Sequence, residues 1–561
     1  MDSILFLWQK DIRMKSLRIA FYVSRYKDED IQTLPSLQYL SGFLIANNLL
    51  EEQNLIFADT IDEILDFKPD ILCIGSVSQT FFDAKNVAIS VKKVFSHCFT
   101  IIGGYHISAL PNELSDEFDV GVIGEGEVTL YELVKVYNNT QHKNIKVLEK
   151  INGICFRDHT RLIITKNREL LKDIDAQPKP YRRVKPNQQR MYIFSARGCP
   201  YQCTFCASQS FWEKYRAHSA QYVVEEIEDV YNKFGITHIY FVDDLFIAPK
   251  SRLIEIHRLL KEKNLIGKLS FEGFVRINII DEEVIFILKE MKFKEIRFGL
   301  ETASPRLLKT IKHQPPKMKK IQEVIELCKK HDLKLCGSLM FGIPGETLED
   351  IEITVKFLRD NINDFYINGF YLMQPVPGTE LWDDMKAKNI LTDTNFDVAS
   401  MEVALYKKDF NWNNALYLNE ENIPLQEFKT IIAKVKDEFI FNTPITLNNN
   451  VLLDIKPTSK ILIFGAGTLA ELLYQEGNKF DITICASSVS ENKMFHHLLI
   501  RSIKDIDLTL YNTIFITPQK DAKLIYETCF SNQNLISNIY IPVYKYVDDI
   551  KTIVWKNINH G

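Results

Sequence analysis

The sequence predicts an α/β protein with an N-terminal Rossmann-like domain, a central partial barrel and a C-terminal Rossmann-like domain. Three separate stretches alternate short apolar runs with longer segments of helical periodicity, which is typical of parallel α/β architecture. A Pro- and Arg-rich stretch at 176–186 predicts a linker after the first of them. The 561 residues suffice for several domains. We expect boundaries at 1–175, 176–400, 401–455 (mostly helical, connecting) and 456–561.

The first stretch predicts a parallel sheet with helices between its strands. Expected strands lie at 17–24, 55–58, 70–75 and 99–103, and expected helices at 36–50 and 81–95. Small polar and glycine residues follow these strands in three loops: Gly75-Ser76-Val77-Ser78, Gly103-Gly104-Tyr105-His106 and Gly124-Glu125-Gly126-Glu127. In open α/β sheets, ligands bind at the carboxyl ends of the strands, where these loops fall.

The second stretch predicts six strand-helix units, and therefore a partial (β/α)6 barrel. Expected strands lie near 191–196, 237–243, 269–276, 295–301, 334–342 and 366–374, with helices around 220–233, 250–263, 281–291, 318–331 and 347–360. A third alternation starts at 460–464 and continues to about 545.

Composition narrows the function classes. A formal net charge of -5 supplies no broad positive field, which disfavours nucleic acid as a partner. No stretch approaches the roughly 18 apolar residues that a membrane span needs. We therefore expect a cytoplasmic protein without a membrane span. Ten cysteines are too sparse for a disulfide scaffold, and seven of them stand scattered in apolar contexts.

The other three cysteines, Cys199, Cys203 and Cys206, form a C-x3-C-x2-C cluster directly after the first barrel strand. This is the end of a βα barrel that carries active sites. Three thiolates can bind three irons of a 4Fe-4S cluster and leave the fourth iron open for a ligand. The alternative is a zinc site, which needs a fourth ligand. The nearest candidate is His218, beside a predicted helix N-cap at Ser219.

These motifs resemble the radical S-adenosylmethionine (radical SAM) superfamily over roughly residues 190–395. The resemblance implies that the cluster chelates SAM and that the three cysteines are both metal ligands and catalytic. It places SAM contacts at five residues: Phe205, Asp243, Asp244, Glu301 and Gly342. Without the resemblance, the aspartates could cap the next helix, Glu301 could be a surface carboxylate, and Gly342 could belong only to a turn. The segment QPVPGTELW at 374–382 is a further family marker without an assigned role.

The N-terminal pattern of LPSLQYLSGFL, GSVS, IIGGYH and VGVIGEGE resembles the cobalamin-binding domain found ahead of many radical SAM barrels. It implies cobalamin contacts from the three loops: Ser76, Ser78, Gly103, Gly104, His106, Gly124, Glu125 and Gly126. Glycines there would let the backbone approach a flat macrocycle. The loop after the first strand lacks D-x-H-x-x-G, so no histidine is offered to cobalt from below. We expect His106 to line the nucleotide tail or to pack, and a domain that has lost cobalamin is the alternative.

The C-terminal stretch carries Gly465-x-Gly467-x-x-Ala470 between a predicted strand and helix, the context of a nucleotide-binding turn. The acidic ribose partner expected about 20 residues later is missing, because Ala486-Ser487-Ser488 follows the second strand. A purely structural Rossmann-like module is therefore an equal alternative.

Together the resemblances imply a cobalamin-dependent radical SAM methyltransferase that acts on a small molecule or natural-product intermediate. The cofactors implied are a 4Fe-4S cluster, SAM and cobalamin, with an external electron donor such as flavodoxin or ferredoxin. A 5'-deoxyadenosyl radical abstracts hydrogen from the substrate, and methylcobalamin then donates the methyl group. The alternatives are an oxidoreductase or cyclase with the same cofactors, a non-catalytic iron-sulfur or zinc protein, and a tRNA-modifying enzyme, which would need a basic RNA-binding module.

Overall fold

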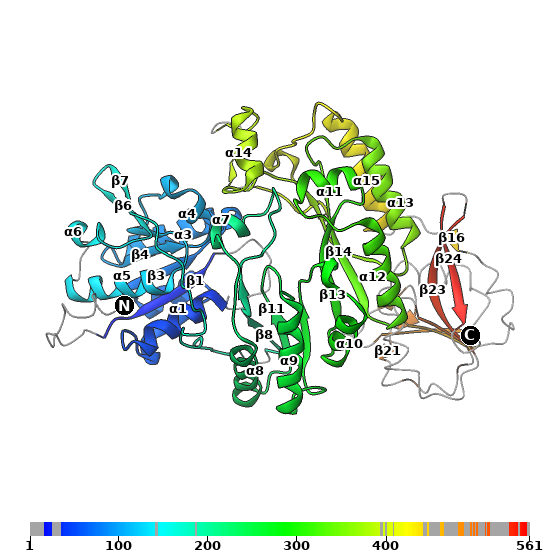
Figure 1. Ribbon diagram of the computed structural model, residues 1–561, viewed down its shortest axis with the longest axis horizontal. Helices are drawn as coiled ribbons and strands as arrows, with labels where there is room; N and C mark the ends of the chain where they lie inside the picture. The colour runs from blue at the N-terminus through cyan, green and yellow to red at the C-terminus, as the bar shows by residue number, and fades with distance from the viewer. Residues whose placement is uncertain are drawn as a thin grey trace. The chain divides into compact units, whose positions relative to one another are not determined.

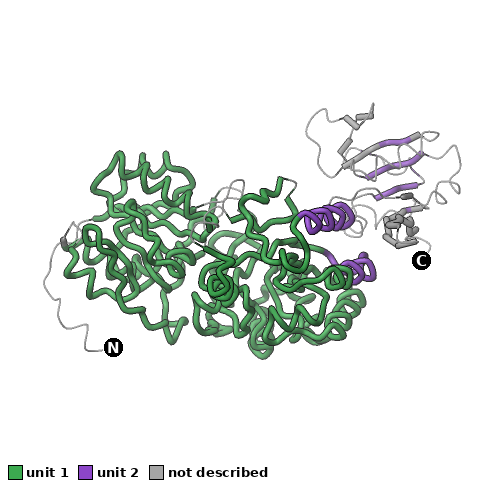
Figure 2. The backbone as a smooth tube through the Cα atoms, turned by 90° about the horizontal axis from the view of Figure 1, so that it is seen from above, with its two compact units in different colours: residues 1–354, 367–425 green, residues 355–366, 426–561 purple. Residues whose placement is uncertain are grey.

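The computed structural model describes most of the first 440 residues and parts of the C-terminal stretch (Figure 1). The described residues are 16–24, 35–140, 144–185, 188–392, 397–398, 401–407, 409–440 and short segments, mostly strands, between 446 and 557. The chain divides into two compact units (Figure 2). The first comprises residues 1–354 and 367–425, and the second comprises residues 355–366 and 426–561.

A seven-stranded sheet in the order β2-β1-β3-β4-β5-β6-β7 forms the N-terminal domain. Its first five strands run parallel. They are β1 (Ile19–Val23), β2 (Leu55–Ala58), β3 (Ile71–Gly75), β4 (Phe99–Gly103) and β5 (Val120–Val122), joined through the helices α1 (Pro35–Ala46), α2 (Ile61–Phe67), α3 (Phe81–Val94), α4 (Tyr105–Ala109) and α5 (Glu127–Thr140). The predicted parallel sheet is confirmed.

Strand β1 is buried on both faces, which explains its continuous apolar sequence. Successive side chains of a strand point to opposite faces. Ile19 and Phe21 pack into one core cluster with Leu37 and Leu44 of α1, whereas Ala20 and Tyr22 belong to a second cluster with residues of α2 and α3. Helices therefore cover both faces of the sheet, as Figure 1 shows.

The sheet ends in an antiparallel hairpin that the sequence analysis did not predict. Strands β6 (Ile154–Asp158) and β7 (Arg161–Ile164) pair antiparallel, and β6 also pairs antiparallel with β5. Only the first three residues of β6 are buried, and every residue of β7 is partly or fully exposed, so the apolar run there is short.

The central domain is a partial barrel of six parallel strands in two groups of three, β8-β11-β12 and β13-β14-β15. Bridges from Phe271 to Phe293 and from Phe274 to Arg297 join the groups. The strands are β8 (Arg190–Ile193), β11 (His238–Phe241), β12 (Ser270–Gly273), β13 (Glu295–Glu301), β14 (Lys334–Phe341) and β15 (Tyr366–Leu372). The helices are α8 (Ala220–Phe234), α9 (Lys250–Glu262), α10 (Glu282–Glu290), α11 (Pro305–Ile311), α12 (Met318–Lys330) and α13 (Leu348–Asp360). The predicted partial barrel is confirmed, with α11 as an addition.

The stretch predicted as a linker packs tightly against α1. The backbone N–H of Tyr181 donates to the carbonyl of Gln38, and Arg182 donates to the side chain of Gln38 at 2.7 Å. A side chain on Gly42 would collide with the carbonyl oxygen of Lys179 at 2.5 Å. This stretch therefore fastens the N-terminal domain to the barrel.

Beyond the barrel, α14 (Glu380–Ala387) and α15 (Leu425–Phe439) are the longer helices that the structure describes. In the second unit, strands assemble in the order β16-β24-β23-β22-β17-β18-β21. The central strands β17 (Lys460–Phe464), β18 (Asp481–Ala486) and β22 (Thr513–Ile516) are parallel, and β24 (Ile550–Asn557) runs antiparallel to β23 (Asn538–Val547). The remaining members are the short strands β16 (Thr446–Leu447) and β21 (Arg501–Ser502). Gly465, Gly467 and Ala470 lie outside the described residues. Among the described helices, none combines the length and apolar character needed to cross a bilayer.

Candidate cofactor sites

The cysteine loop lies at the carboxyl end of β8, where it is held by backbone hydrogen bonds to the last residue of α11 and to the chain that follows it. Thr204 N–H donates to the carbonyl of Ile311 at 3.0 Å, and His313 N–H donates to that of Gln202 at 3.3 Å. From the other side, Leu381 N–H donates to the carbonyl of Thr204 at 2.9 Å. The QPVPGTELW segment thus has a structural role, because it buttresses the cysteine loop.

Cys199, Cys203 and Cys206 are free thiols of intermediate exposure. Burial, with smaller contributions from Asp244 and the neighbouring thiols Cys203 and Cys199, raises the pKa of Cys206 to about 12. Burial also raises the pKa of Cys199 and of Cys203. The three sulfurs therefore share one partly buried space, and a metal must displace their protons.

Two cations stand beside Cys203. Arg276 stacks on the Tyr201 ring with 3.5 Å between guanidinium carbon and ring centroid, and its charge acts to lower the pKa of the Cys203 thiol. Lys312 pairs with Cys203 in an antiparallel backbone bridge, and its ammonium donates to the carbonyl of Gly299 at 2.6 Å. The positive charges offset the charge that bound thiolates would carry.

The carboxylate of Asp243 is buried and hydrogen-bonded to other groups of the protein. Its carboxylate accepts hydrogen bonds from Ser195 N at 2.7 Å, from Ala196 N at 3.1 Å and from the Ser195 hydroxyl. Burial raises its pKa to about 7. Asp244 is exposed, and its carboxylate accepts from the Ser208 hydroxyl at 2.7 Å. The first aspartate fixes the end of β8, and the second borders the helix after Cys206.

Glu301 ends β13 in a left-handed conformation with φ of 68°. Its Oε1 lies 3.3 Å from Lys312 Nζ, whereas its Oε2 is buried without a hydrogen-bond partner in the part of the chain described. A side chain on Gly299 would lie 1.9 Å from Oε1, so only glycine leaves room for this carboxylate. A buried, unsatisfied acceptor in a strained residue is typical of a ligand site.

Gly342 also has a left-handed backbone, with φ of 70°. Its N–H donates to Oε2 of Glu346 at 2.7 Å. Burial raises the pKa of Glu346 to about 8. Phe205 packs against an apolar cluster that includes Ile343 and Trp382. Glu346 was missed in the sequence, although the string GIPGET contains it.

The zinc alternative is disfavoured by the position of its fourth ligand. His218 is buried, its Nδ1 lies 2.8 Å from Oδ1 of Asp175, and its ring stacks on Tyr222 with centroids 4.0 Å apart. Ser219 caps α8 as predicted by accepting from Tyr222 N.

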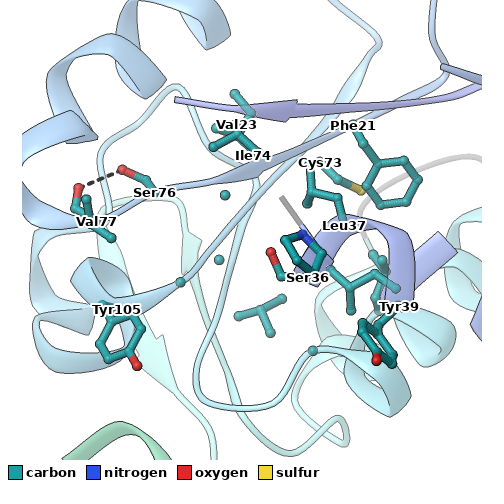
Figure 3. Close-up of a pocket in the computed structure, with 18 of the residues that line it drawn as sticks. Phe21, Val23, Ser36, Leu37, Tyr39, Cys73, Ile74, Ser76, Val77 and Tyr105 are labelled. Carbon is teal, nitrogen blue, oxygen red and sulfur yellow. Dashed lines mark hydrogen bonds between the residues drawn. The ribbon is translucent and has the colours of Figure 1, made fainter. Parts of the chain in front are cut away.

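A cavity of about 520 Å³ opens at the carboxyl edge of the N-terminal sheet (Figure 3). Its floor comes from the loops after β3, β4 and β5, and Tyr39 of α1 and Tyr105 of α4 stand on different sides of it. Barrel residues complete the wall: Phe194, Arg197, Phe211, Trp212 and Val242. The cavity is therefore shared by two domains of one compact unit.

Six of the eight predicted cobalamin residues line this cavity: Ser76, Gly103, Gly104, Gly124, Glu125 and Gly126. Gly104 is required by the backbone, because its φ is 111° and a side chain would lie 2.3 Å from the carbonyl oxygen of Ser76. Ser78 and His106 do not line it. Nδ1 of His106 lies 3.1 Å from the Ser78 hydroxyl, Nε2 lies 3.3 Å from Glu113, and the ring packs on Phe81.

The helix α7 (Ser208–Trp212), directly after the cysteine loop, contributes an aromatic wall to the cavity. Trp212 Nε1–H donates to the Tyr105 hydroxyl at 3.1 Å, and the rings of Tyr105 and Phe211 stack with centroids 4.2 Å apart. Burial and Asp244 raise the pKa of Tyr105 above its ordinary value. A neutral phenol thus stands between the cavity and the cysteine loop.

Comparison with known proteins agrees with this geometry. Residues 193–358 match the model of the radical SAM superfamily, and residues 39–134 match that of the B12 binding domain. An uncharacterized methyltransferase, PH0819 of Pyrococcus horikoshii, is 31% identical over 355 residues, which cover 61% of this chain and 75% of that protein. The chain belongs to the radical SAM superfamily. Its B12 binding domain places it in the cobalamin-binding subgroup.

Two further relatives extend the comparison. The anaerobic magnesium-protoporphyrin IX monomethyl ester cyclase of Cereibacter sphaeroides is 23% identical over 58% of this chain and 54% of that protein. The solved structure of the radical SAM methyltransferase TsrM from Kitasatospora setae, with cobalamin and a 4Fe-4S cluster bound, superposes with a TM-score of 0.56. It shares 17% identity over 66% of this chain and 75% of that one. The predicted fold class is confirmed.

The residues of this radical SAM protein fit the family's cofactors. Three partly exposed thiols on one loop suit a 4Fe-4S cluster, and the unsatisfied Glu301 acceptor suits a polar SAM group. The largely apolar cavity suits a large flat cofactor such as cobalamin. SAM, the cluster and cobalamin are thus the cofactors of this enzyme.

Proposed function

We propose that this enzyme is a cobalamin-dependent radical SAM methyltransferase that acts on a small molecule. The observation that carries the proposal is the shared cavity, whose floor belongs to the B12 binding domain and whose wall follows the cysteine loop. A substrate between these two surfaces would be within reach of both cofactors. Names of relatives support the assignment: besides the methyltransferase of Pyrococcus horikoshii, a cytidylyl-2-hydroxyethylphosphonate methyltransferase from Streptomyces wedmorensis is 22% identical.

When bound, the reduced cluster would supply an electron that cleaves SAM to methionine and a 5'-deoxyadenosyl radical, and cobalamin would supply the methyl group. The protein's own contribution is placement. Glu301, by accepting hydrogen bonds through its free Oε2, would fix the adenosyl ribose. Tyr105, Phe211 and Trp212 would exclude water between the two sites, which protects a radical from side reactions.

A cytoplasmic location and an external one-electron donor such as flavodoxin or ferredoxin belong to the same proposal. The eight cysteines whose side chains the structure describes are all free thiols, which fits a reducing compartment.

The test is turnover of the anaerobically reconstituted chain with dithionite, SAM and hydroxocobalamin. Release of 5'-deoxyadenosine and retention of about one cobalamin per chain are expected, and methyl transfer from labelled SAM to candidate substrates would complete the assignment. Deoxyadenosine release with no methylated product from the substrate that elicits it would favour a cyclase, the named activity of the Cereibacter sphaeroides relative. Failure to bind cobalamin would refute the proposal.

A further inference from the structure

A buried ion-pair cluster joins the cobalamin loop to the strand that leads into the cysteine loop. Arg197 Nη1 donates to Oε1 of Glu125 at 2.7 Å, and Nη2 donates to Oε1 of Glu127 at 2.6 Å. The side chains of Arg197, Glu125 and Glu127 are 6%, 6% and 9% exposed. Both glutamates lie in the Gly124–Glu127 loop of the B12 binding domain, whereas Arg197 lies two residues before Cys199.

A second arginine completes the cluster. Strands β9 (Ala196–Arg197) and β10 (Arg216–Ala217) pair antiparallel, so that Arg197 and Arg216 are directly opposite. Like charges in such a pair repel. Here Arg216 Nη1 donates to Oε1 and Oε2 of Glu125 at 2.9 and 3.0 Å, so one carboxylate lies between the two guanidinium groups. Leu171 N–H also donates to Oε2 of Glu125 at 2.9 Å.

The charges of the cluster balance, since two arginines face two glutamates. Burial lowers the pKa of Arg197, but Glu127 and Glu125 raise it by more, so the guanidinium stays charged. Removing one member would leave an uncompensated charge in the interior. The three residues Arg197, Glu125 and Glu127 also line the shared cavity. The cluster is therefore both a junction of two domains and part of the cofactor site.

Geometry limits how far the two cofactor sites can move apart. Two residues of chain span at most about 7 Å, so the backbone of Arg197 cannot shift without moving Cys199. Gly198 between them has φ of 77°, and a side chain there would lie 2.9 Å from Cβ of Trp212, so this short connection is tightly packed. The Arg197 guanidinium donates to two glutamates of the loop that forms the cavity floor. Its planar, fork-like shape fixes the geometry of these hydrogen bonds.

We infer that Arg197 is a positioning residue that sets the cobalamin loop against the cluster loop and couples the occupancy of the two cofactor sites. The inference rests on the proposed function for the identity of the ligand in the cavity. By linkage, a bound cluster that orders Cys199 and Arg197 should raise the affinity for cobalamin, and bound cobalamin should stabilise the cluster to the same degree. Arg197 itself need not touch the reacting atoms.

The test compares hydroxocobalamin affinity of the full chain with and without the reconstituted cluster. In the unchanged protein we expect about tenfold tighter binding when the cluster is present. Arg197→Lys keeps the positive charge but loses the two parallel N–H donors of the guanidinium. In this variant the ratio of the affinities with and without the iron-sulfur cluster should fall to about one. Arg168→Lys is the matched control, because Arg168 bonds Thr129 and Glu132 within the N-terminal domain and is not among the cavity residues. It should keep the tenfold ratio.

Hydrogen exchange supplies a readout that does not need cobalamin. Cluster loading should slow exchange of the amides around Gly124–Glu127 in the unchanged protein and in Arg168→Lys, but not in Arg197→Lys. Glu127→Gln, which leaves Arg197 paired with Glu125, should give an intermediate result and serves if Arg197→Lys does not fold. If all variants keep full iron content and show equal coupling between the two cofactor sites, the ion pairs of Arg197 are an ordinary contact between domains, and the inference is overturned. If the unchanged protein binds no cobalamin, the proposed function fails, while the exchange experiment still decides the role of Arg197.

Discussion

Lys312 Nζ lies 3.3 Å from Oε1 of Glu301, while Oε2 of the same carboxylate is buried and unpartnered among the described residues. The lysine neutralises one half of the carboxylate, and the other half remains available as an acceptor. This asymmetry is what a ribose contact beside a cluster loop requires, because a buried acceptor that nothing satisfies is costly.

The first prediction concerns this carboxylate. Glu301→Gln keeps the shape but weakens charge-assisted hydrogen bonds, each worth about 1.5–3 kcal/mol. SAM affinity should fall about ten- to a hundredfold, since each 1.4 kcal/mol is a factor of ten. Cluster iron should not change, because the thiols lie on another loop. Calorimetric titration of SAM into the reconstituted variant measures it, and unchanged affinity with intact iron would reduce Glu301 to a barrel-rim carboxylate.

The second prediction concerns the cysteine loop. Replacing Cys199, Cys203 or Cys206 by Ala should remove most cluster iron and all SAM cleavage, because two thiolates hold a cubane poorly. Cys328→Ala is the control, since Cys328 is buried in α12 and should change only stability, by about 1 kcal/mol. Iron and deoxyadenosine are the quantities to measure. Full values of both in any one of the three variants would contradict the ligand assignment.

The third prediction concerns cobalt ligation. His106 is held by Ser78 and Glu113 and does not line the cavity, so it cannot serve as a lower axial ligand without unpacking from Phe81. The cob(II)alamin form should show no nitrogen hyperfine splitting from a protein imidazole. His106→Ala should leave that spectrum unchanged and lower stability by about 1–3 kcal/mol. A spectrum that changes on this substitution would place His106 on the cobalt.

The fourth prediction concerns Gly104. Its φ of 111° and the 2.3 Å approach to the Ser76 carbonyl exclude a side chain, so Gly104→Ala should displace the loop after β4 from the cavity floor. We expect at least a tenfold loss of hydroxocobalamin affinity with cluster iron unchanged. Gly124→Ala is the comparison: its side chain would meet nothing within 4 Å, so only backbone strain of about 1 kcal/mol applies. Equal affinity losses would argue against the steric explanation.

The fifth prediction is a pH dependence from Glu346. Its pKa rises from 4.5 to about 8 on burial, so between these values the unfolded chain loses a proton that the folded chain keeps. The unfolded state then binds fewer protons, and stability falls as pH rises, by up to about 1.4 kcal/mol per pH unit. Glu346→Gln cannot ionise, so its stability relative to the unchanged protein should increase from pH 5 to pH 8. Melting temperatures measured across this range test it, with Glu349→Gln, an exposed glutamate in the first turn of the following helix α13, as the control; a constant difference would refute it.

Much of the architecture could be predicted from the sequence because buried parallel strands carry unmistakable apolar runs. The hairpin of β6 and β7 was not predicted because its buried apolar run is only three residues long and β7 is partly or fully exposed throughout. The three loops named from the sequence line the cavity, but the direction of the side chains within them could not be predicted. His106 and Ser78 turn toward each other inside the domain, whereas their neighbours Tyr105 and Val77 face the cavity.

Hydrogen bonds and ion pairs between residues far apart in the sequence were the second feature that could not be predicted. Asp243 was expected to contact SAM, and its carboxylate accepts hydrogen bonds from the backbone of Ser195 and Ala196, 48 and 47 residues away along the chain. Glu125 was expected at cobalamin, and it also holds two arginines 72 and 91 residues away. No local sequence pattern predicts such partners, because a charged residue that follows a strand gives the same sequence pattern whether it contacts a ligand or another domain.

The two arginines that face each other on β9 and β10 affect the stability of any fragment that separates the barrel from the N-terminal domain. A barrel expressed from residue 176 onward would expose Arg197 and Arg216 side by side, with Glu125 and Glu127 left on the discarded fragment. Their mutual repulsion would open the short ribbon immediately before the first iron ligand. Chimeras that exchange the N-terminal module should therefore transplant both glutamates with it, or carry neutral residues at the two arginine positions.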